Sequence, residues 1–243
     1  MTDSETSKTA NSSKTANSSK TAKTSKTANS SKTANSSKTA KTSKAAKAAS
    51  GPQAAKSAGR APGKRERLAA AAAQVLHEKG VEQTTLADIA RVADVPVGNV
   101  YYYFKTKNEL VEAAIQAHGS GLEELIGRLD ALPAPQDRLK ALLAGWVGQR
   151  ELTARYGCPT GSLASELDKR ADGLDVAVAE VMRRLLDWVG EQFAEMGRED
   201  SRELAVALVA AYQGISLLTN TLRDPGLMLA EGDRLERWID SLG

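Results

Sequence analysis

The residues best suited to chemistry lie between positions 97 and 107 and carry hydroxyl, amide and ammonium groups at helical spacing. Tyrosine hydroxyls and lysine ammonium groups bind phosphate oxygens, and tyrosine rings can contact the methyl group of thymine. Asn99 offers a donor and an acceptor to a base edge, and a glycine lets a helix approach a groove closely. Helical spacing puts Gly98, Tyr101, Tyr102 and Lys105 on one face.

The opposite side of the same helix is apolar and would hold it in place. Val100 and Phe104 fall there and would pack against a preceding helix, which leaves the tyrosines and lysines pointing outward. Thr85, at the start of that preceding helix, would add a hydroxyl and a free backbone N–H for another phosphate. Two plainer interpretations stay open, namely that Tyr103 is a core residue and that the lysines belong to an ordinary solvated face.

Three short helices would position these groups. Apolar residues at three- and four-residue steps predict the first helix, and Gly80 suits its C-terminal cap. Thr84 or Thr85 can cap the second, and a tight turn at 93–95 separates it from the third. This arrangement is typical of a helix-turn-helix unit. The predicted helices cover residues 64–80, 86–92 and 96–104.

The rest of the chain from residue 64 onward also follows helical periodicity, so the predicted fold class is all-α. No alternating run bounded by hairpin turns predicts a strand. We divide this part into a helix-turn-helix domain at 64–110 and a second helical domain at 111–243. Further helices are predicted to start near Thr106 and to cover about 136–155, 162–170, 173–196, 201–222 and 225–241.

Residues 1–63 have a different composition, dominated by Ser, Thr, Ala, Asn, Lys and Gly, which predicts a disordered tail and linker. Ser-Lys-Thr-Ala recurs every six residues from Ser7 to Ser37 without an apolar stripe, so the repeat is not a solenoid. The tail carries 12 Lys/Arg and 2 Asp/Glu, whereas residues 64–243 carry 21 and 28. The overall net charge of +3 therefore hides a basic arm suited to a polyanionic partner.

The helix-turn-helix segment resembles the TetR (tetracycline-repressor) family of transcription regulators over about 47 residues. The similarity rests on the runs 84–90 and 95–110, and its most specific part is Gly-x-x-Tyr-x-Tyr-Phe-x-x-Lys from Gly98 to Lys107. At the position of Val97 the family often has a small polar residue or a lysine. Valine cannot make their polar contact with DNA, and an apolar contact with a thymine methyl would take its place. The resemblance implies DNA contacts from Thr85, Val97, Gly98, Asn99, Tyr101, Tyr102 and Lys107.

The two C-terminal helices have the pattern of a dimer interface. The predicted helix 201–222 has large apolar residues at three- and four-residue steps beside small ones, and 225–241 has its own apolar face. Two such helices from each of two chains would form a four-helix interface, as the resemblance also implies. The alternative is that both faces belong to the monomer core. The residues concerned are Leu204, Leu208, Ala211, Ile215, Leu218, Leu222, Leu235, Trp238, Ile239 and Leu242.

The resemblance further implies a pocket for a small-molecule effector among the middle helices. Pockets combine apolar walls with a few polar groups. Cys158 lies in a non-helical break, where it is either a thiol sensor or an inert buried residue. For the tryptophans, plain core packing is the alternative. The candidate pocket residues are Trp146, Gln149, Arg150, Tyr156, Cys158 and Trp188.

Other classes of function find little support in the sequence. His77 and His118 lack ligand-spaced partners and no nucleotide-binding glycine pattern occurs, so we expect no catalytic site, metal or cofactor. The single cysteine suits a reducing cytosol, and we expect no membrane-spanning segment. The sequence therefore predicts a cytoplasmic, nucleoid-associated repressor, responsive to a ligand, that binds a palindromic double-stranded DNA operator as a homodimer. The alternative is an architectural DNA-binding protein that acts mainly through its basic tail.

Overall fold

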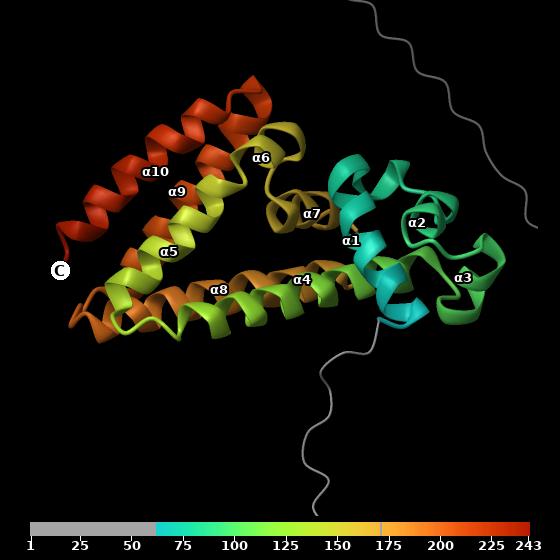
Figure 1. The fold of residues 1–243 in the computed structure, drawn as a ribbon, viewed down its shortest axis with the longest axis horizontal. Helices are drawn as coiled ribbons and strands as arrows, with labels where there is room; N and C mark the ends of the chain where they lie inside the picture. The colour runs from blue at the N-terminus through green and yellow to red at the C-terminus, as the bar shows by residue number, and fades with distance from the viewer. Residues whose placement is uncertain (1–61, 171) are drawn as a thin grey trace, which may run out of the picture. The chain divides into compact units, whose positions relative to one another are not determined.

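The computed structural model describes residues 62–170 and 172–243, so the repeat tail and its predicted disorder lie outside the described residues. Within those two ranges the chain forms ten helices and no strand, which confirms the all-α prediction (Figure 1). The helices are α1 (Lys64–Gln83), α2 (Leu86–Val92), α3 (Val97–Tyr103), α4 (Lys107–Leu129), α5 (Pro135–Gly148), α6 (Arg150–Tyr156), α7 (Pro159–Leu167), α8 (Leu174–Glu195), α9 (Ser201–Leu222) and α10 (Pro225–Asp240).

A first apolar core holds α1, α2 and α3 against the beginning of α4, and α7 and the start of α8 pack on it as well. The predicted caps form, since Thr85 starts α2 and Thr106 starts α4, where its hydroxyl accepts the N–H of Glu109 at 3.2 Å. Asp94 takes a positive φ of 52° in the turn between α2 and α3. The three helices predicted for the helix-turn-helix domain, called the head below, are therefore present. The helix α4 runs from the head into the second half of the chain without a break at residue 110.

Gly80 interrupts α1 with a φ of 77°, in the region that favours glycine. A Cβ atom there would lie 3.0 Å from the carboxylate oxygens of Glu166. That carboxylate, on α7, accepts the backbone N–H of Val81 at 2.6 Å. The predicted helix end at Gly80 is thus a kink, after which the helix resumes as far as Gln83.

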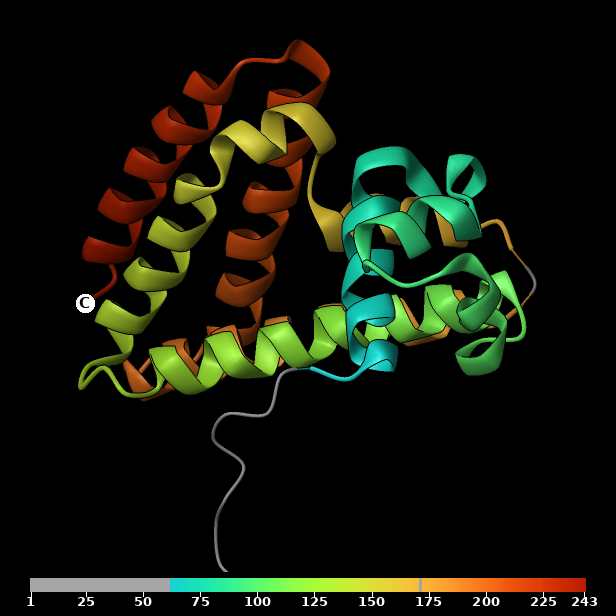
Figure 2. The ribbon, with the colours of Figure 1, turned by 45° about the vertical axis from the view of Figure 1, so that its right-hand side comes forward.

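The helices α4 and α8 contact each other along their length and lie side by side in two views (Figures 1 and 2). A second apolar core lies between the later part of α4 and α5, α8, α9 and α10. Trp188 is buried in it, and its indole N–H donates to Asp130 Oδ1 at 2.9 Å. This core supports the half of the molecule that follows the head.

Two helix boundaries differ from the predictions. The single helix expected over 136–155 is broken at Gln149 into α5 and α6, next to Gly148, whose low helix propensity favours the break. The helix expected from residue 162 begins at Pro159 instead. Proline suits a first helical position, and Cys158 Sγ caps the helix by accepting the N–H of Gly161 at 3.4 Å.

The helix α9 bears on two expectations, the absence of a membrane-spanning segment and the position of the dimer face. It is long and apolar enough, by length and composition, to cross a membrane, because residues 204–222 carry no charge. In this fold it packs against α6, α8 and α10, as a core helix does. Part of the predicted dimer face is instead buried within the chain, namely Leu208 of α9 and Leu235 and Ile239 of α10. The apolar and small residues that α9 leaves exposed are Val206, Ala207, Ala210, Gly214, Leu217, Leu218 and Leu222.

Candidate nucleic-acid interface and ligand cavity

The helix α3 has the two faces that its sequence predicts. The side chains of Val100 and Phe104 are buried in the first core. The side chains of Tyr101 and Tyr102 are 53% and 77% exposed, and Val97 is exposed as well. Both tyrosines are largely free of packing against the described residues, so they form an exposed aromatic surface that is available to a partner.

Tyr103 lies between these two faces. It is half-buried against the first core, and its ring meets that of Tyr102 edge-on with the centroids 4.9 Å apart. Asn99 is half-exposed, and Gly98 has no heavy atom within 4 Å of the place a Cβ would occupy. A side chain at position 98 would therefore meet nothing within the described chain, and the backbone of α3 is open to a partner there.

Both predicted lysines reach carbonyl groups at helix ends. Lys105 Nζ donates to the carbonyl oxygen of Tyr101 at 2.7 Å, and Lys107 Nζ donates to that of Glu82 at 3.3 Å. Each ammonium group has three N–H donors. The positive charges are thus held beside α3 with donors left over for phosphate oxygens.

Thr85 forms a reciprocal cap with Asp88. Its hydroxyl accepts the N–H of Asp88 at 3.1 Å, and its own N–H donates to Asp88 Oδ2 at 3.2 Å. The expectation of a free N–H at Thr85 is therefore wrong, because the capping carboxylate already accepts it. A phosphate at this helix end would have to displace the Asp88 carboxylate from the N–H of Thr85 or share that N–H with it.

The pKa of the Asp88 carboxyl is held far below its ordinary value, first by the hydrogen bond from Lys79 and then by those from Thr85. Lys79 Nζ lies 2.8 Å from Asp88 Oδ1. A carboxyl with a lowered folded-state pKa contributes stability that is present above its unfolded pKa, near 3.8, and is lost as the pH falls through the folded value.

Replacing Asp88 with asparagine should therefore lower the thermal midpoint of unfolding at pH 7, by removing the ion pair with Lys79. The difference from the unchanged protein should shrink steadily as the pH falls below about 4. Asp94→Asn is a matched control, because Asp94 makes no ion pair within the described residues. A difference for Asp88→Asn that stays constant from pH 7 to pH 2 would contradict this account.

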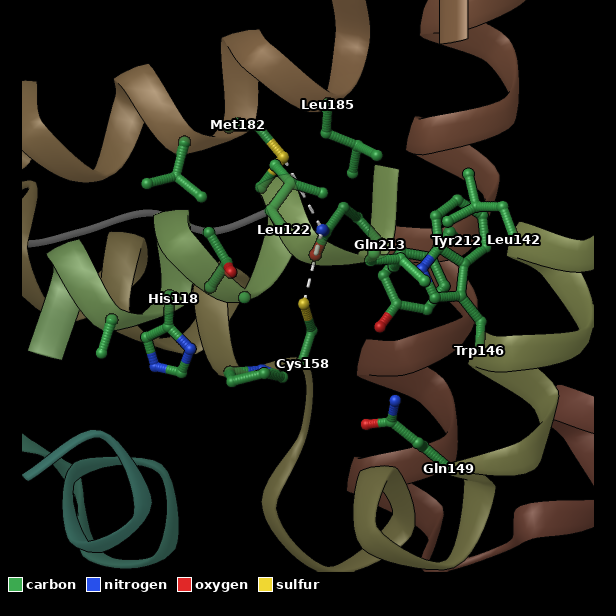
Figure 3. A pocket seen from close by; sticks show the side chains of 16 residues that line it. His118, Leu122, Leu142, Trp146, Gln149, Cys158, Met182, Leu185, Tyr212 and Gln213 are labelled. Carbon is green, nitrogen blue, oxygen red and sulfur yellow. Dashed lines mark hydrogen bonds between the residues drawn. The ribbon is translucent and has the colours of Figure 1, made fainter. Parts of the chain in front are cut away.

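A cavity of about 270 Å³ lies among α4, α5, α7, α8 and α9 (Figure 3). Trp146 of α5 and Tyr212 of α9 stack against each other, with ring centroids 4.0 Å apart and planes 15° from parallel. Gln213 Nε2 donates to Cys158 Sγ at 3.5 Å and to Met182 Sδ at 3.9 Å. The remaining labelled side chains in Figure 3 are His118, Leu122, Leu142, Gln149 and Leu185.

The structure brings together three of the residues that we expected to line a pocket: Trp146, Gln149 and Cys158. The other three lie outside this cavity. Tyr156 packs edge-on against His77 with centroids 5.6 Å apart, Trp188 is fully within the second core, and Arg150 donates to the carbonyl of Val147 at 3.3 Å.

The sequence analysis missed Tyr212 and Gln213, because we assigned the whole of α9 to a dimer interface. Their sequence does offer a sign, because Tyr212 and Gln213 are adjacent polar residues within a largely apolar stretch of helix. Burial, followed by the nearby Cys158, raises the pKa of the Tyr212 hydroxyl above its ordinary value. Burial, followed by the charge of His77, lowers the pKa of His118. Both side chains are therefore neutral at pH 7.

The segment 157–161, which joins α6 to α7 and includes the first turn of α7, touches both the cavity and the helix-turn-helix head. Cys158, Pro159 and Thr160 line the cavity. The carbonyl oxygen of Gly157, a residue with a φ of 79°, lies 2.9 Å from His77 Nε2 on α1. Because Glu166 of the following α7 also binds α1 at Val81, this short segment fixes the wall of the cavity to the first helix of the head.

Two family models match the chain. Residues 68–114 match the model described as "Bacterial regulatory proteins, tetR family". Residues 135–232 match that described as "Transcriptional regulator LmrA/YxaF-like, C-terminal domain". The first covers the helix-turn-helix head and the second covers all of α5 to α9 and part of α10.

Known proteins agree with these matches. The HTH-type transcriptional regulator BetI of Klebsiella pneumoniae is 30% identical over 164 residues, 65% of this chain and 83% of its own length. An uncharacterised HTH-type regulator of Lactococcus lactis is 25% identical over 74% of this chain and 94% of its own. The crystal structure of regulatory protein TetR from Rhodobacter sphaeroides shares the fold at a TM-score of 0.63 and 24% identity, covering 72% of this chain and 97% of that one. The chain therefore belongs to the TetR family of DNA-binding transcription regulators.

Proposed function

We propose that this protein is a repressor responsive to a small molecule, and that it binds a palindromic operator as a homodimer in the cytoplasm. The observation that carries the proposal is the exposed tyrosine face of α3, held in place by the buried Val100 and Phe104. A recognition helix presented in this way fits the major groove of B-DNA. Because each chain has one such helix, a second copy would supply the other half-site.

In this proposal the side chains on and around α3 divide into two groups. Asn99 reads a base edge, and Val97 with the ring of Tyr101 contacts thymine methyl groups. The others bind phosphate and set the position of the helix in the groove. The phosphate-binding group consists of Tyr102, Lys105, Lys107 and Thr85, with Gly98 allowing the close approach of the backbone.

The exposed stripe of α9 supports the dimer. Ala207, Ala210 and Gly214 recur along one face at spacings that allow another helix to approach closely, and large apolar residues border them. Leu217, Leu218 and Leu222 are 66%, 50% and 62% exposed in the single chain. An apolar surface of this kind is typical of an interface with a second protein chain.

The cavity and the segment 157–161 support a response to a ligand. A molecule in the cavity touches Cys158, Pro159 and Thr160, whose neighbour Gly157 binds α1 through His77. A ligand that binds best when this segment is displaced would shift the population toward a different placement of the head. In a dimer, that shift changes the distance between the two recognition helices and weakens binding to both half-sites.

Footprinting with purified full-length protein on fragmented genomic DNA tests this proposal against an architectural role. A repressor protects one or a few short palindromes, whereas an architectural protein covers DNA without preference. A truncated chain that lacks residues 1–60 should protect the same sequence, with a smaller dependence of affinity on salt, since a basic arm releases counterions from any DNA. Protection that disappears with the tail would favour the architectural role.

Asn99→Ala should reduce the preference for the operator over a single-base variant by about 1–3 kcal/mol, because it removes the group that reads a base edge. Competition binding with a set of operators, each changed at one base pair, measures that preference. Lys105→Ala is the control, since loss of a phosphate contact weakens binding to all sequences alike. Equal loss on every operator variant for Asn99→Ala would remove Asn99 from base recognition.

A further inference from the structure

We infer that the cavity takes an uncharged, largely apolar ring compound with one or two hydrogen-bonding groups, and that it rejects carboxylates and ammonium ions of the same shape. The inference rests on the proposed function in one respect, namely that this compound is the effector that controls DNA binding. Three features of the cavity walls determine which ligands fit: their charge, their shape and their polar groups without a hydrogen-bond partner.

Charge is the first observation. The sixteen side chains that line the cavity contain no Asp, Glu, Lys or Arg. Two titratable rings line the cavity, the half-buried His118 and the buried Tyr212, and both are neutral at pH 7 for the reasons given above. A ligand with a net charge would lose its water and gain no counter-charge, which is strongly unfavourable. An uncharged ligand loses much less water and can gain apolar contacts.

Shape is the second observation. The stacked rings of Trp146 and Tyr212 form one side of the cavity, and Leu122, Leu185 and Met182 also line it (Figure 3). A flat aromatic ring fits such a space, and thioether sulfur makes favourable contacts with ring edges. A cavity of about 150 Å³ holds benzene. The 270 Å³ here therefore suits a ligand of about one or two fused rings.

Unpaired polar groups are the third observation. His118, Gln149 and Thr160 border the cavity, and their side chains make no hydrogen bond to any other residue in the described ranges. Among the described residues, Gln213 donates to two sulfur atoms, which are weak acceptors. A hydroxyl, carbonyl or carboxamide on the ligand would find partners among these groups. The ligand class therefore includes a small number of polar, uncharged substituents.

Isothermal titration calorimetry with three naphthalene compounds tests the inference on the full-length protein without DNA. 2-Naphthamide and 2-naphthoate have the same shape and differ in charge, and 2-naphthylmethylammonium carries the opposite charge. We expect 2-naphthamide to bind at least tenfold more tightly than either ion. Equal or tighter binding of an ion, or no binding by any of the three, would overturn the inference.

Two variants place the binding in this cavity. Leu185→Trp fills the space and should abolish binding of 2-naphthamide. Gln149→Arg introduces a cation at a side chain that lines the cavity and has no partner within the described chain, and it should raise the affinity for 2-naphthoate several-fold relative to the affinity for 2-naphthamide. No effect of either variant would place the binding elsewhere. Operator protection is measured without any ligand, so failure of this inference and failure of the proposed function give separate results.

Discussion

Replacing Phe104 with alanine is expected to destabilise the folded protein by about 3–5 kcal/mol, the largest loss that we predict for a single side chain. Phe104 is only 2% exposed and ends α3 against the first core, and the guanidinium carbon of Arg65 lies 5.1 Å from the centre of its ring. Removing the ring leaves a cavity and also ends this contact with the cation. Unfolding in urea, followed by circular dichroism, measures the loss.

Tyr102→Phe is the matched control for that prediction. The tyrosine is largely exposed, so losing its hydroxyl should hardly change the free energy of unfolding. Operator binding should weaken by about 1 kcal/mol, through loss of one phosphate hydrogen bond. If both variants lower the stability equally, the assignment of one buried and one DNA-facing side of α3 fails.

Replacing Leu218 with lysine should convert the dimer into a folded monomer. Leu218 is half-exposed in the single chain, so the fold tolerates a lysine there, but in the proposed interface each lysine would be a buried and unpaired charge. Such a charge costs about 3–5 kcal/mol, which raises the dimer dissociation constant about a hundredfold or more. Sedimentation equilibrium measures association, and operator affinity should fall with it.

Val176→Lys provides the comparison, because Val176 of α8 is similarly exposed at 57% and lies outside the α9 stripe. This variant should remain a dimer and bind its operator normally. A Leu218→Lys protein that is folded and still dimeric would show that the chains associate through another surface.

The head of this protein could be predicted closely because its signals are local. Thr85, Thr106 and Pro96 mark helix starts through short-range capping and backbone preferences, and the alternation of Val100 and Phe104 with tyrosines fixes the faces of α3. The kink at Gly80 was the exception. It is accompanied by a contact with Glu166, which accepts the N–H of Val81 from 85 residues further along the chain, and no local pattern reveals that contact.

The cavity was harder to predict because its walls come from five helices. Trp146, Gln149 and Cys158 were identified by residue type, but Trp188 has the same type and lies in the core beside Asp130. Periodicity shows that a helix such as α9 has apolar residues on more than one side, but not which side meets its own chain. Tyr212 therefore faces the cavity, while the exposed side carries Leu217 and Leu218.

The hydrogen bond between His77 and the Gly157 carbonyl joins the head to the segment beside the cavity, and under the proposed function it couples the DNA site to the ligand site. A coupling between two binding sites is reciprocal, so whatever the ligand does to operator affinity, the operator does to ligand affinity by the same factor. A ligand that weakens operator binding a hundredfold corresponds to a coupling free energy of about 2.7 kcal/mol. The operator-bound dimer would then hold that ligand a hundredfold more weakly than the free dimer does. DNA would act as an antagonist of the ligand without entering the cavity, and a scarce ligand would occupy unbound dimers first.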